Sequence, residues 1–165
     1  VRLTVIGDGP MRAQYEAQAR RLLGTGFLFL GVQPHDVVKD FMSRAYLFAM
    51  PSISMPSGQA EAFGVVFLEA QAMGVPVVSF ATGGIPEVVS HGETGFLAEE
   101  GNVGQLAFYI ERLLESPELR ERLGRAGRRR VERMFDLEVQ NAKLERLYEE
   151  VLETARAGEK RGRNV

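Results

Sequence analysis

Residues Glu61–Phe80 read EAFGVVFLEAQAMGVPVVSF. The first part has the composition of a helix that is apolar on nearly every face, from about Phe63 to Met73, as expected of a helix buried in a protein interior. Gly74 is typical of a helix C-terminus. The β-branched run Val75–Phe80 then predicts a buried strand. A buried helix that leads directly into a buried strand is typical of a parallel sheet covered by helices.

The chain on either side of this stretch repeats the alternation of short apolar runs and helical patterns. The expected strands are Leu3–Ile6, Phe27–Leu30, Tyr46–Met50, Val75–Phe80 and Gly95–Leu97. The expected helices run from Pro10 to Leu23, from Pro34 to Met42 and from Phe63 to Met73, with a short one after Gly83-Gly84-Ile85-Pro86. We therefore predict an α/β fold, a Rossmann-like parallel sheet with helices on both faces.

From about residue 102 onward the pattern is entirely helical. Helices are expected near 103–115, 117–132 and 136–155, separated by Ser116-Pro117 and Phe135-Asp136. Residues 1–155 thus form the predicted domain. The polar and basic residues 156–165 are predicted to be a flexible tail.

The composition excludes several classes of function. The 165 residues carry 20 Lys+Arg against 22 Asp+Glu, a net charge of −2, which argues against nucleic acid as a partner. There is no cysteine, which excludes disulfides and thiolate zinc sites, and the two histidines are far apart in the sequence. We expect no metal site. The longest apolar runs are far shorter than the roughly 20 residues that span a bilayer.

Glu69 falls in the apolar helix. Burying its carboxylate without a partner would cost on the order of several kcal/mol. No Lys or Arg lies between Arg44 and Arg112, so a nearby salt bridge is not expected. Hydroxyl groups are then the natural partners, and two carboxylate oxygens suit the vicinal diol of a ribose. The alternative is an exposed Glu69, or one paired over a long range.

Glu61 immediately precedes the same helix, where it either favours the positive end of the helix dipole or faces a ligand. The backbone N–H groups of Phe63, Gly64, Val65 and Val66 would be free at a helix start and could bind a diphosphate. A carboxylate repels a phosphate. Glu61 facing the ligand is therefore compatible with a diphosphate at the same helix start if Glu61 contacts a sugar and not the phosphate.

Four linked motifs appear in order along this region. Glu61 and Glu69 form an E-x7-E pair; they are followed by Ala-x-Ala-x-Gly-x-Pro-Val-Val (Ala70–Val78), Gly-Gly-Ile-Pro-Glu-Val-Val (Gly83–Val89) and Gly-Glu-Thr-Gly-Phe-Leu (Gly92–Leu97). Together they resemble the C-terminal, donor-binding half of a GT-B glycosyltransferase of the retaining family 4 type, the group 1 glycosyl transferases. The resemblance covers about nine-tenths of the chain, as far as the helix that ends near Leu152.

The resemblance implies an enzyme that transfers a hexosyl group from a nucleotide-diphosphate sugar to an acceptor hydroxyl with retention. Glu61 would lie against the donor sugar near the anomeric carbon and is the candidate catalytic residue. Glu69 would hold the ribose hydroxyls, and the Phe63, Gly64, Val65 and Val66 backbone would bind the diphosphate and sugar. Gly58 would line the cleft, and Gln33 would present its backbone to the base. Such enzymes usually need no metal or other cofactor.

The chain departs from the family pattern at its start. The Arg and Lys that normally clamp the diphosphate lie upstream of the first strand in the family and have no counterpart before Val1. The N-terminal acceptor domain is absent from the sequence as well. We therefore expect this domain to need that partner half, and to bind donor weakly and transfer nothing alone.

Two alternatives remain open from the sequence. A sugar-nucleotide epimerase or phosphorylase could use the same architecture, and a non-catalytic nucleotide-binding module could keep the fold. An acceptor saccharide or lipid-linked sugar, a cytoplasmic location and peripheral association with the inner face of the membrane follow from the resemblance as expectations.

The sequence features outside the four motifs have structural interpretations. Gly7-Asp8-Gly9-Pro10 lacks the third spaced glycine of a dinucleotide fingerprint. His35 and His91 are expected to face solvent, as is Arg128-Arg129-Arg130 in its mixed-charge helix. An apolar stripe near the C-terminus is expected to be a docking face for the partner half; it consists of Leu144, Leu147, Tyr148, Val151 and Leu152.

Overall fold

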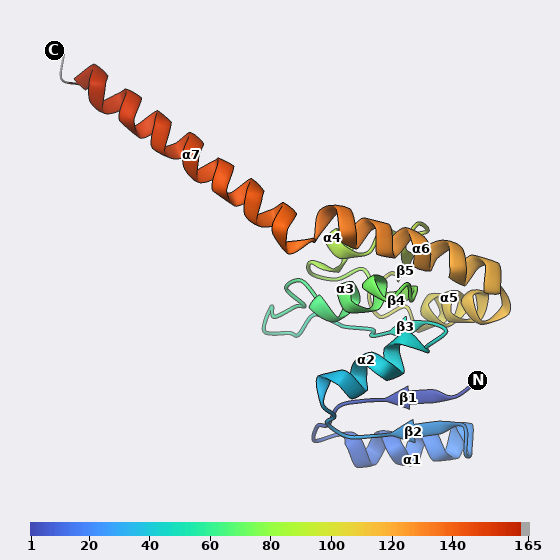
Figure 1. Cartoon of the computed structure of the whole chain (residues 1–165). Helices are drawn as coiled ribbons and strands as arrows, with labels where there is room; N and C mark the ends of the chain where they lie inside the picture. The colour runs from blue at the N-terminus through green and yellow to red at the C-terminus, as the bar shows by residue number, and fades with distance from the viewer. Residues whose placement is uncertain (163–165) are drawn as a thin grey trace. The chain divides into compact units, whose positions relative to one another are not determined.

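The computed structural model describes the backbone of residues 1–162 and the side chains of residues 1–154. The chain divides into two compact units, Val1–Ala45 and the residues from Tyr46 onward. Figure 1 labels the helices and strands of both units.

The first unit contains β1 (Leu3–Val5), α1 (Arg12–Leu23), β2 (Phe27–Phe29) and α2 (His35–Ser43). The two strands pair in parallel, with Leu3 opposite Phe27 and Val5 opposite Phe29. Helix α1 ends at Gly24, which has a positive φ of 60° and donates its N–H to the Arg20 carbonyl. This is the glycine-ended helix that the sequence predicts.

The second unit contains β3 (Phe48–Ala49), α3 (Val65–Ala72), β4 (Val77–Phe80), α4 (Ile85–Val88) and β5 (Gly95–Ala98). Its three strands form a parallel sheet in the order β3-β4-β5. Every residue of β4 and β5 is buried, as expected of strands covered on both faces.

Three further helices complete this unit: α5 (Val103–Glu115), α6 (Pro117–Met134) and α7 (Leu137–Gly162). The Asn102 side chain caps α5 by accepting the Gln105 N–H at 3.0 Å, and Ser116 caps α6 by accepting the Leu119 N–H at 3.1 Å. Leu113 and Leu123 are fully buried with Val78, Phe96 and Ala98, so α5 and α6 close one core with the central strands.

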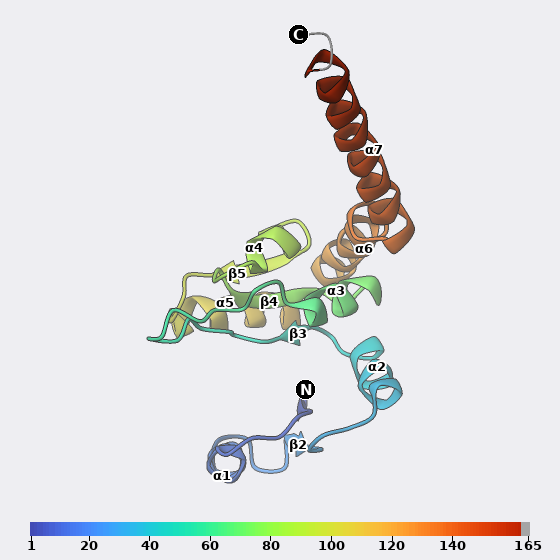
Figure 2. The same cartoon turned by 90° about the vertical axis from the view of Figure 1, so that its left-hand side faces the viewer.

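Helix α7 projects away from the strands of its unit in Figure 1, and the turned view of Figure 2 shows the same projection. Its apolar stripe is about half exposed. The helix was expected to end near residue 155 but continues to Gly162. Residues 155–162 are mostly good helix formers, and one interior glycine costs only about 1 kcal/mol. The last part of the predicted tail, 163–165, lies outside the described residues.

The α/β class, the parallel pairing and the helical C-terminus are confirmed, with two differences. The strands form two separate parallel sheets, β1-β2 and β3-β4-β5, where the sequence predicts one. The strand expected over Tyr46–Met50 is reduced to Phe48–Ala49, because only these residues are in register with Val77 and Val78 of β4. In the described part of the chain no helix is both long and apolar enough to span a bilayer.

Helices α3 and α6 pack with almost no space between their backbones. A Cβ on Gly124 of α6 would lie 1.9 Å from the Gly74 carbonyl oxygen, at the end of α3. A Cβ on Gly127, one turn later, would lie 3.0 Å from Gln71 Cγ. Gln71 is fully buried and donates Nε2 to the carbonyls of Phe67 and Val88 at 3.3 and 3.2 Å, which ties α3 to α4.

We predict that Gly124→Ala will lower the free energy of unfolding by about 3 kcal/mol, because the added methyl must push α6 from α3. Gly104→Ala is the control: its Cβ would meet only Asn102 Oδ1 at 3.7 Å, so a gain of about 0.5–1 kcal/mol from helix propensity is expected. Urea unfolding of both variants measures the difference. An unchanged midpoint for Gly124→Ala would contradict the packing described here.

Candidate functional site

The backbone before α3 lies directly against the loop after β4. Gly84 donates its N–H to the Glu61 carbonyl at 2.9 Å. A Cβ on Gly83 would lie 2.0 Å from the Glu61 carbonyl oxygen, and one on Gly84 would lie 2.1 Å from that of Ala62. Neither distance is compatible with a side chain, so the paired glycines are what allow the two segments to meet.

The start of α3 is sharper than the sequence predicts. Gly64 has φ 76° and ψ 61°, in the left-handed region, so the helix begins at Val65 and not at Phe63. Phe67 donates its N–H to the Gly64 carbonyl at 2.9 Å, and its ring lies where a Gly64 Cβ would be. Val65 and Val66 thus occupy the first helical positions, where backbone N–H groups point out of the helix, while Phe63 and Gly64 precede it.

The two predicted carboxylates stand at either end of this segment. Glu61 is half-buried, and its Cγ is 3.5 Å from the position of a Gly64 Cβ. Glu69 is half-buried in the second turn of α3. The helix is less enclosed than its composition suggests, since Val65 is 60% exposed while the polar Gln71 is fully buried.

Of the residues expected to face solvent, His91 is exposed as expected and Arg130 is half-buried, and both make structural contacts. Arg130 is half-buried: Nη2 donates to the Glu87 carbonyl at 2.8 Å, and the guanidinium lies 5.9 Å from the centre of the Phe135 ring. That ring packs edge-on against Phe63, with 5.8 Å between ring centres. His91 is exposed, yet its Nδ1 accepts the Leu97 N–H at 3.1 Å.

Gly58 lies on the exposed segment between β3 and α3. It has φ 83°, and it donates its N–H to the Met55 carbonyl at 2.9 Å; Met55 donates its own N–H to the Gln59 carbonyl at 2.7 Å. This closed turn needs the positive φ that glycine adopts without strain. Gly58 therefore shapes the loop that leads to Glu61.

A polar cluster that sequence reasoning missed holds the first part of this loop. Glu100, just beyond β5, accepts hydrogen bonds from the Ser54 N–H and, at 3.1 Å, from Ser54 Oγ. Ser54 Oγ is also 2.8 Å from Oγ1 of the buried Thr82. Hydrogen bonds from the Ser54 N–H, from Ser54 Oγ and from Thr82 lower the pKa of the Glu100 carboxyl. No motif marks Glu100, and Thr82 is marked only by its place before Gly83.

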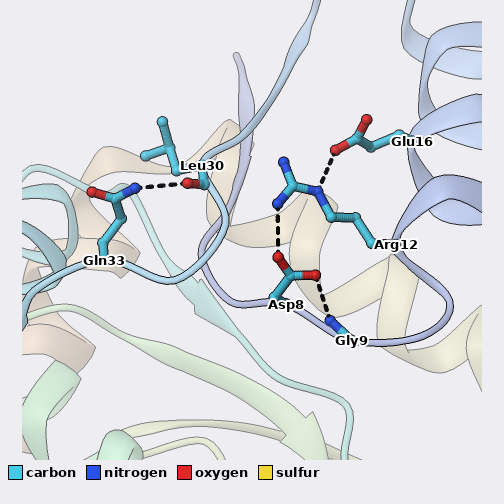
Figure 3. A network of polar contacts seen from close by, with 6 residues as sticks. All are labelled: Asp8, Gly9, Arg12, Glu16, Leu30 and Gln33. Atoms are coloured by element: carbon cyan, nitrogen blue, oxygen red, sulfur yellow. Dashed lines mark hydrogen bonds and ion pairs between the residues drawn. The ribbon is translucent and has the colours of Figure 1, made fainter.

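Gln33 belongs to the first unit, whereas the other predicted site residues belong to the second. Its side chain turns back and donates Nε2 to the Leu30 carbonyl at 2.6 Å, as Figure 3 shows. The side chain is thus used to hold the loop after β2. The bond does not involve the Gln33 backbone, which is the part that the sequence analysis expects to contact a base.

The neighbouring loop after β1 is held by Arg12 (Figure 3). Its guanidinium donates to Asp8 at 3.0 Å and to Glu16 at 2.7 Å, and Asp8 also accepts the Gly9 N–H at 2.8 Å. The Gly9 N–H and Arg12 together lower the pKa of Asp8 from its ordinary value of 3.8. Among the described residues, no group of three or more His, Cys, Asp or Glu could hold a metal ion.

The architecture matches that of solved GT-B glycosyltransferases, and the chain corresponds to a C-terminal-like domain of that fold. The family described as "Glycosyl transferases group 1" matches residues 1–130. The chain belongs to this family.

Two relatives illustrate the range of the family. The chain is 34% identical over 158 residues to N-acetyl-alpha-D-glucosaminyl L-malate synthase of Bacillus anthracis, covering 95% of this chain and 39% of that protein. It is 35% identical over 146 residues to the GDP-mannose-dependent monoacylated alpha-(1-6)-phosphatidylinositol monomannoside mannosyltransferase of Corynebacterium glutamicum, covering 86% and 37%. The chain thus spans less than two-fifths of the length of either relative.

Among solved structures, Alr3699/HepE of Anabaena, in complex with UDP-glucose, matches with a TM-score of 0.76 and 28% identity. The match covers 91% of this chain and 41% of that one.

We predict that the pKa of Asp8 lies below 3.8. It should rise in Arg12→Gln but stay below 3.8, because the Gly9 N–H still donates a hydrogen bond to the carboxylate. Because the folded-state pKa is lowered, the carboxylate stabilises the fold above about pH 4, and this stabilisation is lost as the pH falls through the folded-state value. NMR titration measures the pKa. Asp8→Asn should unfold more readily than wild type at pH 7, and the difference should shrink as the pH falls through the folded-state pKa of Asp8; a constant difference would contradict the assignment.

Proposed function

We propose that this chain is the donor-binding half of a retaining glycosyltransferase, which moves a hexosyl group from a nucleotide-diphosphate sugar to an acceptor hydroxyl. The observation that carries the proposal is the segment Glu61–Val66, fixed by Gly83 and Gly84 at the start of α3. It places the Glu61 side chain next to Gly64, immediately before the first turn of α3, whose N–H groups are not used by hydrogen bonds within the helix. The structural similarity to a protein that binds UDP-glucose supports it.

In this proposal the Val65 and Val66 N–H groups stabilise the diphosphate, with Phe63 and Gly64 lining its approach. Negative charge grows on the diphosphate as the bond between its oxygen and the anomeric carbon breaks; the acceptor oxygen forms a new bond to that carbon, and the proton of the acceptor hydroxyl passes to the departing diphosphate. N–H groups fixed before the reaction stabilise such charge without reorganising. Retention is part of the proposal and follows from the family resemblance.

Glu61 would contact the donor sugar near its anomeric carbon, and Glu69 would accept hydrogen bonds from the ribose hydroxyls. Gly58 would line the cleft, and the Gln33 backbone would contact the base. The acceptor, a saccharide or a lipid-linked sugar reached at the inner face of the membrane from the cytoplasm, would be held by a second domain. We propose that no metal takes part and that the isolated domain is inactive.

Glu69→Ala should weaken nucleotide binding about 10- to 100-fold, because a hydrogen bond to a charged group contributes about 1.5–3 kcal/mol. Ligand-observed NMR against UDP, GDP, ADP and their sugar conjugates measures this, and saturation transfer to the ribose protons identifies the base. Glu111→Ala, which removes an exposed glutamate on α5, is the control and should bind like wild type. Binding that survives Glu69→Ala unchanged would refute the ribose role.

Glu61→Gln in the full-length protein should lower kcat by about 10- to 100-fold, the loss expected when a charged hydrogen bond to the reacting sugar is replaced by a neutral one. Initial rates of sugar transfer measure the effect. A folded Glu61→Gln variant that turns over at the wild-type rate would favour the non-catalytic nucleotide-binding module.

A further inference from the structure

Within the loop between β3 and α3, residues 54–61 contact one short segment, residues 82–84, at both of their ends. At the first end, Ser54 Oγ lies 2.8 Å from Oγ1 of Thr82. At the second, the Glu61 carbonyl accepts the Gly84 N–H at 2.9 Å. Residues 54–61 therefore form an excursion whose two ends lie against residues 82–84, and Gly58 is at its exposed turn.

The two ends are held by different means. The Glu61 end is fixed by the backbone, because the approach of Gly83 and Gly84 leaves no space for a side chain. The Ser54 end is held by Glu100, which accepts both the N–H and the Oγ of Ser54. Among the described residues, the other hydrogen bond of Ser54 is the one with Thr82, so loss of Glu100 would leave the exposed Ser54 end held by that contact.

We infer that Glu100 is a positioning residue for sugar transfer, which keeps the loop of residues 54–61 in the conformation that binds the donor. The inference deepens the proposed function and rests on it, because Glu61 and Gly58 lie on this loop. Glu100 itself acts through Ser54 and contacts no reacting atom.

A positioning role and a folding role for Glu100 differ in which kinetic constant they change. If only a fraction of molecules holds the loop in the binding conformation, the apparent affinity for the donor falls by that fraction. A saturating concentration of donor shifts the molecules back to the ordered loop, so kcat is preserved. Glu100→Ala should therefore raise KM for the donor about tenfold and leave kcat nearly unchanged. A variant that is merely less folded would lose active protein and show a lower kcat with an unchanged KM.

The experiment uses the full-length protein with UDP-glucose, GDP-mannose and ADP-glucose assayed in parallel. Glu100→Ala is compared with Glu100→Gln, whose amide can still accept the Ser54 N–H and contact its Oγ, and which should recover most of the wild-type KM. Glu99→Ala is the matched control, because it removes the adjacent exposed carboxylate, which has no side-chain partner among the residues that the structure describes. It should behave as wild type.

Hydrogen exchange of the peptide covering residues 51–60, followed by mass spectrometry, reports on the loop without relying on activity. Exchange should be faster in Glu100→Ala than in wild type or Glu99→Ala, with no change in the β4 and β5 peptides. Unchanged loop exchange, or a wild-type KM in Glu100→Ala, would overturn the inference while leaving the proposed function intact. A folded wild-type protein that used none of the three donors and bound no nucleotide would refute both.

Discussion

The contact between the backbone at Glu61–Ala62 and the backbone at Gly83–Gly84 is the constraint on which the candidate site depends. The carbonyl oxygens of this first segment lie 2.0 and 2.1 Å from where Cβ atoms at positions 83 and 84 would be. One hydrogen bond of 2.9 Å joins the two segments. Both segments follow strands of one parallel sheet, so the sheet brings them to the same edge. Glycine at 83 and 84 lets them touch there, which sets the position of Glu61 and the entry into α3.

A second set of close contacts supports α3 from its other end. Gly124 and Gly127 let α6 approach Gly74 and Gln71, and α6 in turn carries Arg130 to the carbonyl of Glu87. The helix that presents the candidate site is thus held by backbone-close packing, with few polar links. Such packing is rigid, since a well-packed interior leaves little space for adjustment.

Most of the fold could be predicted because its signals are local. Apolar runs, helical spacing and glycine at helix ends place nearly every element within a few residues, and the linked motifs around Glu61 and Glu69 indicate the family. What could not be predicted depends on contacts between distant residues. Glu100 meets Ser54 across 46 positions, and neither belongs to a recognisable motif. The left-handed Gly64, which delays α3, depends on where the Phe67 ring packs.

The link between Asp8, Arg12 and Glu16 bears on what the first unit can recognise. One guanidinium is shared by two carboxylates, so the three side chains together carry one negative charge. The loop after β1 therefore has no surplus positive charge to offer a phosphate, despite its glycines and its resemblance to part of a dinucleotide-binding turn. The glycine-rich loop of this unit is electrostatically suited to the uncharged parts of a ligand and disfavours its anionic parts.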